Sequence, residues 1–399
     1  MKKVNITRQH APALLFPISL MLAGNAMALE PAAIDAGPIQ FIPQMNVQVG
    51  YDDNIYSTEN DSVDSVISVL NPSIQAILEK GLNVYSLNYA LKQGIYGHGS
   101  ADNYTDHDLS AQALLDFNIR NRMELLVRRL DTHENRGSGL NQGSAATAND
   151  APIEYHVDTV SAKYAYGAET AKGIIEVAAD LNDRKYDNFR SQTAVKDRQV
   201  ANSSATFYYR VMPKTSLLFE VSKKDIDYDR SSVTLDSQES KYLVGATWDA
   251  TAKTSGKLKF GYAEKNFDSA SREDDEGISW ELSMLWSPKT YSVVDIATSK
   301  VAEETDGTGN YIDSTSLDLQ WTHSWSDVWR TRASFGASTK DYVSSDREDD
   351  LRSYGAGIDY DMRRWLSLGL DYAYTEQDSN QLDLDYEKNT VYLTAQISL

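Results

Sequence analysis

The residues best suited to acid–base chemistry in this sequence are its histidines, which are few. Beyond the first 28 residues there are five: His98, His107, His133, His156 and His323. All but His323 fall near the loop-side ends of expected strands, where Asp106, His107 and His133 form the one combination suited to an Asp–His pair. The sequence has no Gly-x-Ser-x-Gly nucleophile motif, no HExxH motif and no metal-ligand spacing. We therefore expect no enzyme, and no catalytic, cofactor-binding or metal-binding residues.

A short acidic segment is the second candidate for chemistry. Asp52-Asp53-Asn54, beside Gly50, offers the oxygen ligands that a hard cation prefers. One short acidic turn is weak evidence for a cation site. Longer acidic runs at 272–276 and 346–350 are typical of solvated loops rather than ion sites.

The chain is strongly acidic and lacks cysteine. Its first 28 residues hold three of the 38 Lys and Arg residues and none of the 58 Asp and Glu residues, so the remainder has a net charge of −23. This balance argues against nucleic acid as a partner, because phosphate binding needs clustered Lys and Arg. Without disulfides, an exported chain of this length must be stabilised by a large hydrogen-bonded framework.

The N-terminus has the pattern of an export signal. Lys2, Lys3 and Arg8 precede an apolar stretch at 11–23, and Ala26-Met27-Ala28 supplies a small-x-small cleavage pattern. A membrane anchor is the alternative, but the apolar stretch is too short and contains two prolines. We predict a signal peptide over residues 1–28, a short periplasmic segment over 29–40 and one β-barrel domain over 41–399.

Two-residue alternation of apolar and polar side chains dominates the rest of the chain. Ile278, Trp280, Leu282, Met284 and Trp286 alternate with Ser279, Glu281, Ser283 and Leu285. Segments at 109–119, 354–360 and 366–375 follow the same rule. This periodicity predicts β-strands, each long enough to cross a membrane when tilted.

Counting these segments predicts an antiparallel up-and-down barrel of about 18 strands. The expected strand centres lie near residues 48, 70, 89, 113, 127, 161, 178, 205, 220, 244, 262, 281, 296, 318, 335, 357, 371 and 392. Short connections such as 213–215 and 288–290 alternate with longer polar ones, the largest at 135–152. This asymmetry is typical of barrels in the Gram-negative outer membrane, and an even strand number places both termini in the periplasm.

A membrane barrel explains a sequence whose average is polar. In lipid every backbone N–H and C=O needs a partner within the protein, and a closed barrel needs only every second residue to be apolar. Aromatic residues expected at strand ends on the lipid face fit interfacial girdles; they are Tyr85, Tyr164, Tyr166, Trp248, Trp286, Trp329, Tyr360 and Tyr374. The alternatives are a soluble β-sandwich and a propeller, but no blade-length repeat is visible.

The opposite face of the strands is expected to line a wide lumen. Its predicted charged residues are Lys92, Asp116, Arg120, Glu124, Arg128, Lys163, Glu176, Asp180, Arg210, Glu220, Lys224, Lys241, Lys257, Lys259, Glu281, Asp318, Arg330, Arg332, Lys340, Asp359 and Asp371. Such a surface suits polar solutes or a hydrated polymer, although mixed charges also simply solvate the interior of a wide barrel. Inward aromatic residues are expected to be few, with Tyr208 and Tyr392 as candidates.

The first strands resemble a known family. Gly50-Tyr51-Asp52-Asp53-Asn54, Asn71-Pro72-Ser73, Asp102-Asn103-Tyr104-Thr105-Asp106-His107 and His133-Glu134-Asn135-Arg136-Gly137 are similar to segments of the outer-membrane β-barrels of exopolysaccharide and capsule loci, the putative β-barrel porins. The resemblance in motifs covers about residues 45–140. It implies a barrel that works with a periplasmic polysaccharide export protein to pass a secreted polysaccharide across the outer membrane, and it implies no catalytic residues.

Three functions follow from this reading. The first is passive export of an exopolysaccharide through a polar lumen, with outer-membrane lipid, the polymer and the periplasmic export protein as partners. The second is a general diffusion porin for small polar solutes. The third is a structural or adhesive barrel whose loops bind a partner, with the loop at 135–152 as a lid.

Overall fold

Alternating side chains along the whole chain produce one closed antiparallel sheet. The computed structural model describes residues 33–251 and 253–398, so the expected signal peptide at 1–28 lies outside the described residues. The strands are β1 (Ile34–Ala36), β2 (Ile39–Asp52), β3 (Ser65–Lys80), β4 (Asn83–Tyr96), β5 (Tyr104–Asn118), β6 (Asn121–Glu134), β7 (Ile153–Tyr166), β8 (Gly173–Tyr186), β9 (Arg198–Met212), β10 (Thr215–Tyr228), β11 (Ser237–Thr251), β12 (Thr254–Phe267), β13 (Asp275–Lys289), β14 (Ser292–Glu303), β15 (Ile312–Ser324), β16 (Trp329–Tyr342), β17 (Glu348–Arg363), β18 (Leu366–Ser379) and β19 (Tyr386–Ser398).

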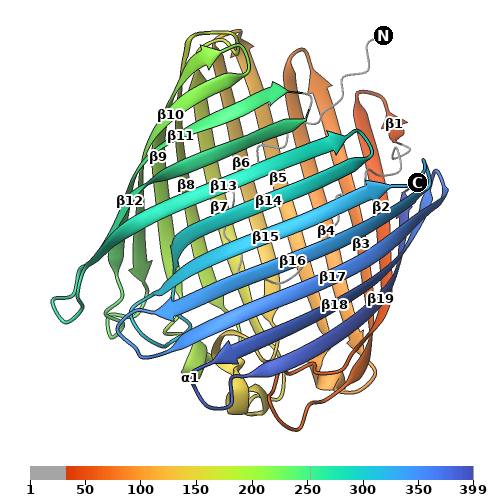
Figure 1. Ribbon diagram of the computed structural model, residues 1–399, viewed down its shortest axis with the longest axis vertical. Helices are drawn as coiled ribbons and strands as arrows, with labels where there is room; N and C mark the ends of the chain where they lie inside the picture. Colours follow the sequence, from red (N-terminus) through yellow and green to blue (C-terminus); the bar gives the residue numbers. More distant parts are fainter. Residues whose placement is uncertain (1–32, 252, 399) are drawn as a thin grey trace.

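The barrel closes between its first and last long strands. Each strand from β2 to β19 pairs antiparallel with the next, and β19 pairs with β2 from Thr390↔Asp52 to Ser398↔Gln44 (Figure 1). The three-residue β1 only adds to the start of β2. The prediction of an 18-stranded barrel is therefore confirmed, and every expected strand centre lies within its strand.

The connections differ at the two ends of the barrel. At the turn end, two to six residues join the strands, and the register shifts in the β-ladders cluster there, as at Asp116/Asn118 and Asp361/Arg363. At the loop end the connections are mostly longer: L1 (53–64), L2 (97–103), L3 (135–152), L4 (187–197), L5 (229–236), L6 (268–274), L7 (304–311), L8 (343–347) and L9 (380–385). L2 contains the 3-10 helix η1 (Ser100–Asp102), L3 contains η2 (Gly139–Asn141) and η3 (Gly143–Thr147), and L4 contains α1 (Arg190–Thr193), which marks the loop end at the bottom of Figure 1.

The apolar side chains cover the outside of the barrel instead of filling its centre. On β10, Leu217, Phe219 and Val221 are exposed outward, whereas Glu220 and Lys224 point inward. A compact apolar cluster occurs at the loop end, where Ile55, Ile67 and Val69 pack together. An apolar outer surface of this kind is suited to contact with the hydrocarbon layer of a membrane. Among the described residues, no helix combines the length and apolar character of a membrane-spanning segment.

Candidate functional site

The inner wall carries the charged residues that the alternation assigned to it. By strand register, all the predicted lumen residues except one share the inward face with the buried or half-buried polar side chains. Arg120 differs, because it lies in the exposed turn between β5 and β6. The strand ends there after Asn118, whose side-chain oxygen accepts hydrogen bonds from the backbone N–H groups of Arg120 and Asn121. The alternation could not show where pairing stops.

Most charges on the inner wall are paired between neighbouring strands. Lys163 of β7 lies 2.9 Å from Glu124 of β6, and Arg332 of β16 binds Asp359 at 2.9 Å and Asp371 at 2.7 Å. Lys259 bridges Glu220 at 2.9 Å and Glu281 at 2.8 Å. These pairs neutralise the wall locally and hold side chains flat against it, which leaves a polar surface of low net charge.

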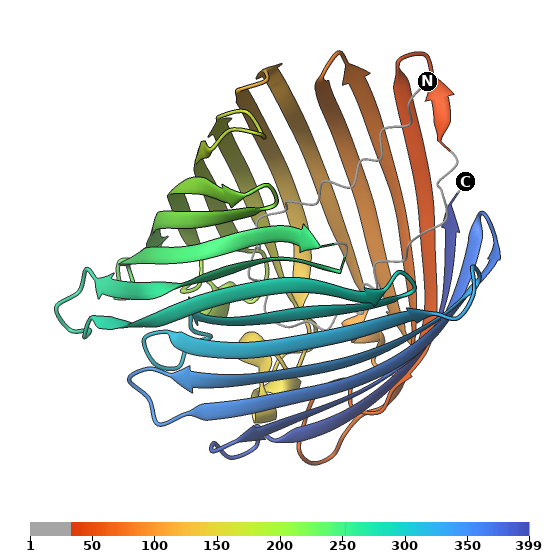
Figure 2. The same ribbon diagram turned by 45° about the horizontal axis from the view of Figure 1, so that its top comes forward.

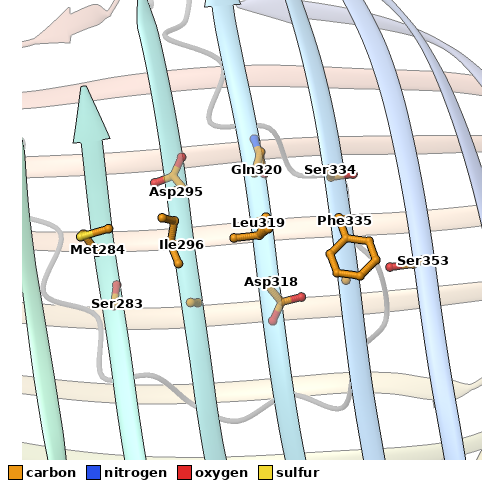
Figure 3. A pocket seen from close by; sticks show the side chains of 12 residues that line it. Ser283, Met284, Asp295, Ile296, Asp318, Leu319, Gln320, Ser334, Phe335 and Ser353 are labelled. Atoms are coloured by element: carbon orange, nitrogen blue, oxygen red, sulfur yellow. The ribbon is translucent and has the colours of Figure 1, made fainter. Parts of the chain in front are cut away.

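A groove on the inner wall of β13–β17 contains aspartates that are not paired with a cation of the described residues. Its volume is about 230 Å³, and its polar lining comes from Asp295, Asp318, Gln320 and small residues that include Ser334 and Gly336 (Figure 3). Within the described part of the chain, neither aspartate lies within 4.0 Å of a cation. A side chain at Gly336 would meet Asp318 and Ser353, so glycine keeps the groove open. The groove can accept hydroxyl groups or a cation.

The long loop L3 turns inward from the end of β6, and its start is anchored by the residues of the family-like motifs. Arg136 pairs with Asp102 of L2 at 2.5 Å, with both side chains buried, and its guanidinium stacks 4.6 Å from the ring centroid of Tyr56 in L1. The Tyr56 hydroxyl donates to Asp102 at 2.9 Å. Gly137 has φ 82°, and a Cβ there would lie 2.1 Å from the carbonyl oxygen of Tyr56. The Arg-Gly pair therefore fixes the angle at which L3 enters the barrel.

The middle of L3 reaches loops of the opposite wall. The Arg347 guanidinium of L8 donates to the side-chain oxygen of Gln142 at 2.6 Å, although the two residues are 205 positions apart. Gly143, with φ 55°, lies against the backbone of Asp383 in L9. Ala146 has no exposed surface. In Figures 1 and 2 the yellow helical segment of L3 accordingly lies within the outline of the loop end.

Arg347 makes the main contact between L3 and this wall. It contacts Asp349 through three nitrogen–oxygen pairs of 2.5–3.1 Å, lies 3.4 Å from Asp306 of L7, and stacks 4.1 Å from the ring centroid of Tyr342. Arg347 and Asp349 are 7% and 3% exposed. One buried guanidinium thus holds L3, L7 and L8 together.

L7 also folds inward, through Glu304. Its carboxylate accepts hydrogen bonds from Lys224 of β10 and Lys265 of β12, both at 3.1 Å, and from the Tyr228 hydroxyl at 3.3 Å. Burial alone would raise the pKa of this carboxyl, but the surrounding cations outweigh burial and hold the pKa well below its ordinary value of 4.5. Glu304 is therefore ionised and ties L7 to the inner wall.

Aromatic rings face inward at the loop end in larger number than the sequence reading expected. Tyr208, near the turn end, and Tyr392 face inward. The inward rings at the loop end include Tyr96, Tyr104, Tyr155, Tyr186, Tyr228, Phe267, Tyr342 and Tyr386. The expectation of few inward rings is wrong. In β8, Tyr186 stands an even number of residues after the inward Asn182 and Arg184, and in β10 Tyr228 stands four residues after the inward Lys224. The alternation of each strand, continued to its end, therefore predicts that these rings face inward.

The histidine and acidic-turn candidates are engaged within the protein. His133 Nδ1 lies 2.8 Å from Asp106 and Nε2 lies 3.0 Å from Asn135, whereas His107 faces outward against Tyr89. Asp52 pairs with Lys388 at 2.9 Å, and Asp53 accepts two hydrogen bonds from Asn389 at 2.7 and 2.8 Å. In the described chain, no three His, Asp or Glu side chains converge as metal ligands. The acidic turn instead stabilises the contact between β2 and β19.

Comparison with known proteins agrees with this architecture. Residues 27–399 match the family model described as Putative beta-barrel porin 2. No curated protein sequence matches the chain. The structure is similar to a BenF-like porin from Pseudomonas fluorescens Pf-5 (TM-score 0.50, 7% identity, covering 90% of this chain and 99% of that chain). It is also similar to OpdO from Pseudomonas aeruginosa (TM-score 0.50, 12% identity, 90% and 97%).

A longer chain is matched only in part. The chain spans 62% of the FrpB iron transporter from Neisseria meningitidis, with 87% of this chain covered, a TM-score of 0.47 and 9% identity. At these identities the structural likeness concerns the fold alone, which is that of outer-membrane porins.

Proposed function

The chain belongs to the Putative beta-barrel porin 2 family, and from that premise we propose that it is a passive outer-membrane channel for small polar solutes. An even strand number places both termini on the same side of the membrane. The short turns on that side assign it to the periplasm, and the long loops assign the loop end to the outside. A ring of 18 strands is too wide for its own side chains to fill, so water occupies the space that L3 and L7 leave. The paired charges of the inner wall then form a hydrated lining for solutes in transit.

The observation that carries this proposal is the path of L3. A buried ion pair between Arg136 and Asp102 holds the start of L3, and the middle of the loop is held on the opposite wall by the hydrogen bond from Arg347 to Gln142. L3 therefore subdivides the mouth of the barrel. A small solute passes beside the loop, whereas a polymer has to displace it.

The experiment is a swelling assay on proteoliposomes with neutral sugars of increasing length. Wild-type protein should admit monosaccharides and exclude longer oligosaccharides. A variant in which residues 138–149 are replaced by a short Gly-Ser linker should move the cut-off to larger sugars. Absence of monosaccharide uptake by folded wild-type protein would refute the proposal.

Export of a secreted polysaccharide is the second candidate. The inward tyrosines at the mouth support it, because aromatic rings present flat apolar faces on which sugar rings can pack. In this reading L3 leaves the mouth during secretion, and a periplasmic polysaccharide export protein delivers the polymer to the turn end. Deletion of the chain should then stop surface polymer and cause it to accumulate in the periplasm. Unchanged surface polymer would leave the small-solute channel as the function.

A further inference from the structure

Three cations at the loop end of β8 and β9 lie against tyrosine rings: Arg184 at the end of β8, Lys196 in L4 and Arg198 at the start of β9. Arg184 lies 4.8 Å from the ring centroid of Tyr155, Lys196 lies 5.9 Å from that of Tyr186, and Arg198 lies 5.8 Å from that of Tyr228. We propose that these three cations form a binding site for an oxyanion, such as the carboxylate of an acidic sugar. We call them the basic triad.

The sheet register places the basic triad in one patch. Arg184 and Arg198 are directly opposite each other across the β8–β9 pair. Lys196 lies two residues before Arg198, whose guanidinium donates to the Lys196 carbonyl at 3.2 Å. Like charges directly opposite each other on a sheet destabilise it. The repulsion between Arg184 and Arg198 therefore destabilises the sheet here, and an anion bound between them would offset that repulsion.

The basic triad differs from most cations of the inner wall. Lys92 and Lys257 also lie over tyrosine rings, at 5.5 and 5.9 Å from the ring centroids of Tyr104 and Tyr208, but each is a single cation, whereas the triad groups three. Lys163, Lys259 and Arg332 each lie within 3.0 Å of a carboxylate. No carboxylate in the described part of the chain lies within 4.0 Å of any member of the triad. The tyrosine rings stabilise the cations by cation–π contact without neutralising them.

Lys196 strengthens the argument because it is only 8% exposed. Among the described residues no acceptor lies within hydrogen-bond distance of its ammonium group, and burial lowers the pKa of Lys196. Burying an ammonium without an acceptor is unfavourable. An oxyanion between Lys196 and the two arginines would supply both the charge and the acceptor.

The neighbouring carboxylates accept hydrogen bonds from other donors, and Oε2 of Glu134 is buried without a hydrogen-bond partner in the described part of the chain. Glu134 accepts a hydrogen bond from the Tyr186 hydroxyl at 2.6 Å, Glu304 is held by Lys224 and Lys265, and Asp306 is paired with Arg347. In this part of the wall the five cations Arg184, Lys196, Arg198, Lys224 and Lys265 therefore lie near three carboxylates, those of Glu134, Glu239 and Glu304. A local positive charge in a chain of net charge −20 favours an anion at this position.

The choice of a carboxylate follows from geometry. Guanidinium groups present forked N–H donors that match the two oxygens of a carboxylate, or two oxygens of a phosphate. Of the three tyrosine rings beside the cations, Tyr186 and Tyr228 are buried, and the half-buried Tyr155 can contact the body of the same solute. This inference rests on the proposed function, since it names the class of solute that the channel selects.

The experiment is calorimetric titration of detergent-solubilised, folded protein with glucuronate, with glucose as the matched neutral sugar and with inorganic phosphate. Glucuronate should bind and glucose should not. Arg198→Gln and Lys196→Gln should each weaken glucuronate binding about 10-fold or more, as expected for the loss of one charge-assisted hydrogen bond. Arg198→Lys should retain part of the affinity. Lys223→Gln, which removes an outward-facing cation from β10, should leave the affinity unchanged.

The phosphate titration identifies the source of the oxyanion. Binding of glucuronate assigns the site to acidic sugars, and binding of phosphate alone assigns it to inorganic oxyanions; both outcomes support an oxyanion site. Equal heats for glucuronate and glucose without phosphate binding, or affinities that the triad variants do not change, would overturn it. Because calorimetry does not need an open pore, this failure is distinct from absence of glucose uptake by proteoliposomes, which would refute the channel itself.

Discussion

Replacing Arg347 with glutamine should release L3 from the opposite wall and enlarge the conducting pathway. In the wild type this guanidinium donates to Gln142, binds Asp349 through several atoms, and approaches Asp306. Glutamine is too short and too weak a donor to replace these contacts. L3 would keep its anchor at Arg136 but lose its strongest contact at the far end.

The magnitude follows from the burial of the pair. Removing one partner of a buried ion pair typically costs about 3–5 kcal/mol, because the other charge remains buried. Asp349 keeps hydrogen bonds from Ser379 at 2.6 Å and from Tyr342 at 3.2 Å, so we expect the lower end of that range. The bond from Arg347 to Gln142 accounts for about 1.5–3 kcal/mol of L3 docking. Its loss should increase the population of undocked L3 by roughly 10- to 100-fold.

Single-channel recording in planar bilayers measures this effect. Arg347→Gln should show a larger mean conductance and more frequent large openings than the wild type. Arg352→Gln is the matched control. Arg352 lies in β17, the strand that follows L8, points outward and has a side chain 55% exposed in its ion pair with Glu376, so little should change. Conductance of Arg347→Gln identical to that of the wild type, with the barrel folded, would refute the role assigned to this contact.

Three further predictions follow from particular contacts. The pKa of Glu304 is held below its ordinary value of 4.5, so its stabilisation of L7 is complete above about pH 4.5 and should be lost as the pH falls below that value. Thermal unfolding temperatures measured between pH 7 and pH 3 should therefore depend less on pH in Glu304→Gln than in the wild type. The loop variant Glu273→Gln should keep the pH dependence of the wild type. Gly137→Ala should weaken the entry of L3 and raise conductance, because the new Cβ would meet the Tyr56 carbonyl and the positive φ costs about 1–2 kcal/mol; Gly277→Ala, which has open space around it, should behave like the wild type. Val221→Arg, at an outward position 53% exposed in the middle of β10, should destabilise the barrel by about 2–4 kcal/mol in bilayers, measured by denaturant titration, and an unchanged midpoint would show that this face does not contact lipid.

The strands could be read from the sequence because the barrel has a simple rule. Each residue of β13, from Ile278 to Trp286, alternates between lipid and interior, and this local pattern needs no knowledge of distant contacts. The short turns and long loops followed from the same reading. The two strands that close the barrel also follow from the sequence, because the first and last alternating segments become β2 and β19.

The arrangement at the mouth could not be read in the same way. Gln142 and Arg347 are 205 residues apart, and Glu304 meets Lys224 and Lys265 across intervening strands. Nothing in the local composition of L3 distinguishes a loop that folds inward from one that extends into solvent. The basic triad was also missed. Arg184 and Arg198 keep the inward parity of β8 and β9, but their pairing across the two strands and the position of Lys196 in L4 depend on the register, which the alternation does not give.

The most direct test of the account is chemical labelling at two adjacent positions of β10 during single-channel recording. The chain contains no cysteine, so Ser222→Cys on the inner face and Val221→Cys on the outer face can each be probed alone with a charged, membrane-impermeant thiol reagent. We predict that the reagent modifies Ser222→Cys and reduces its conductance, while Val221→Cys is unaffected. Modification of Val221→Cys with no reaction at Ser222→Cys would contradict a water-filled lumen enclosed by an apolar outer face.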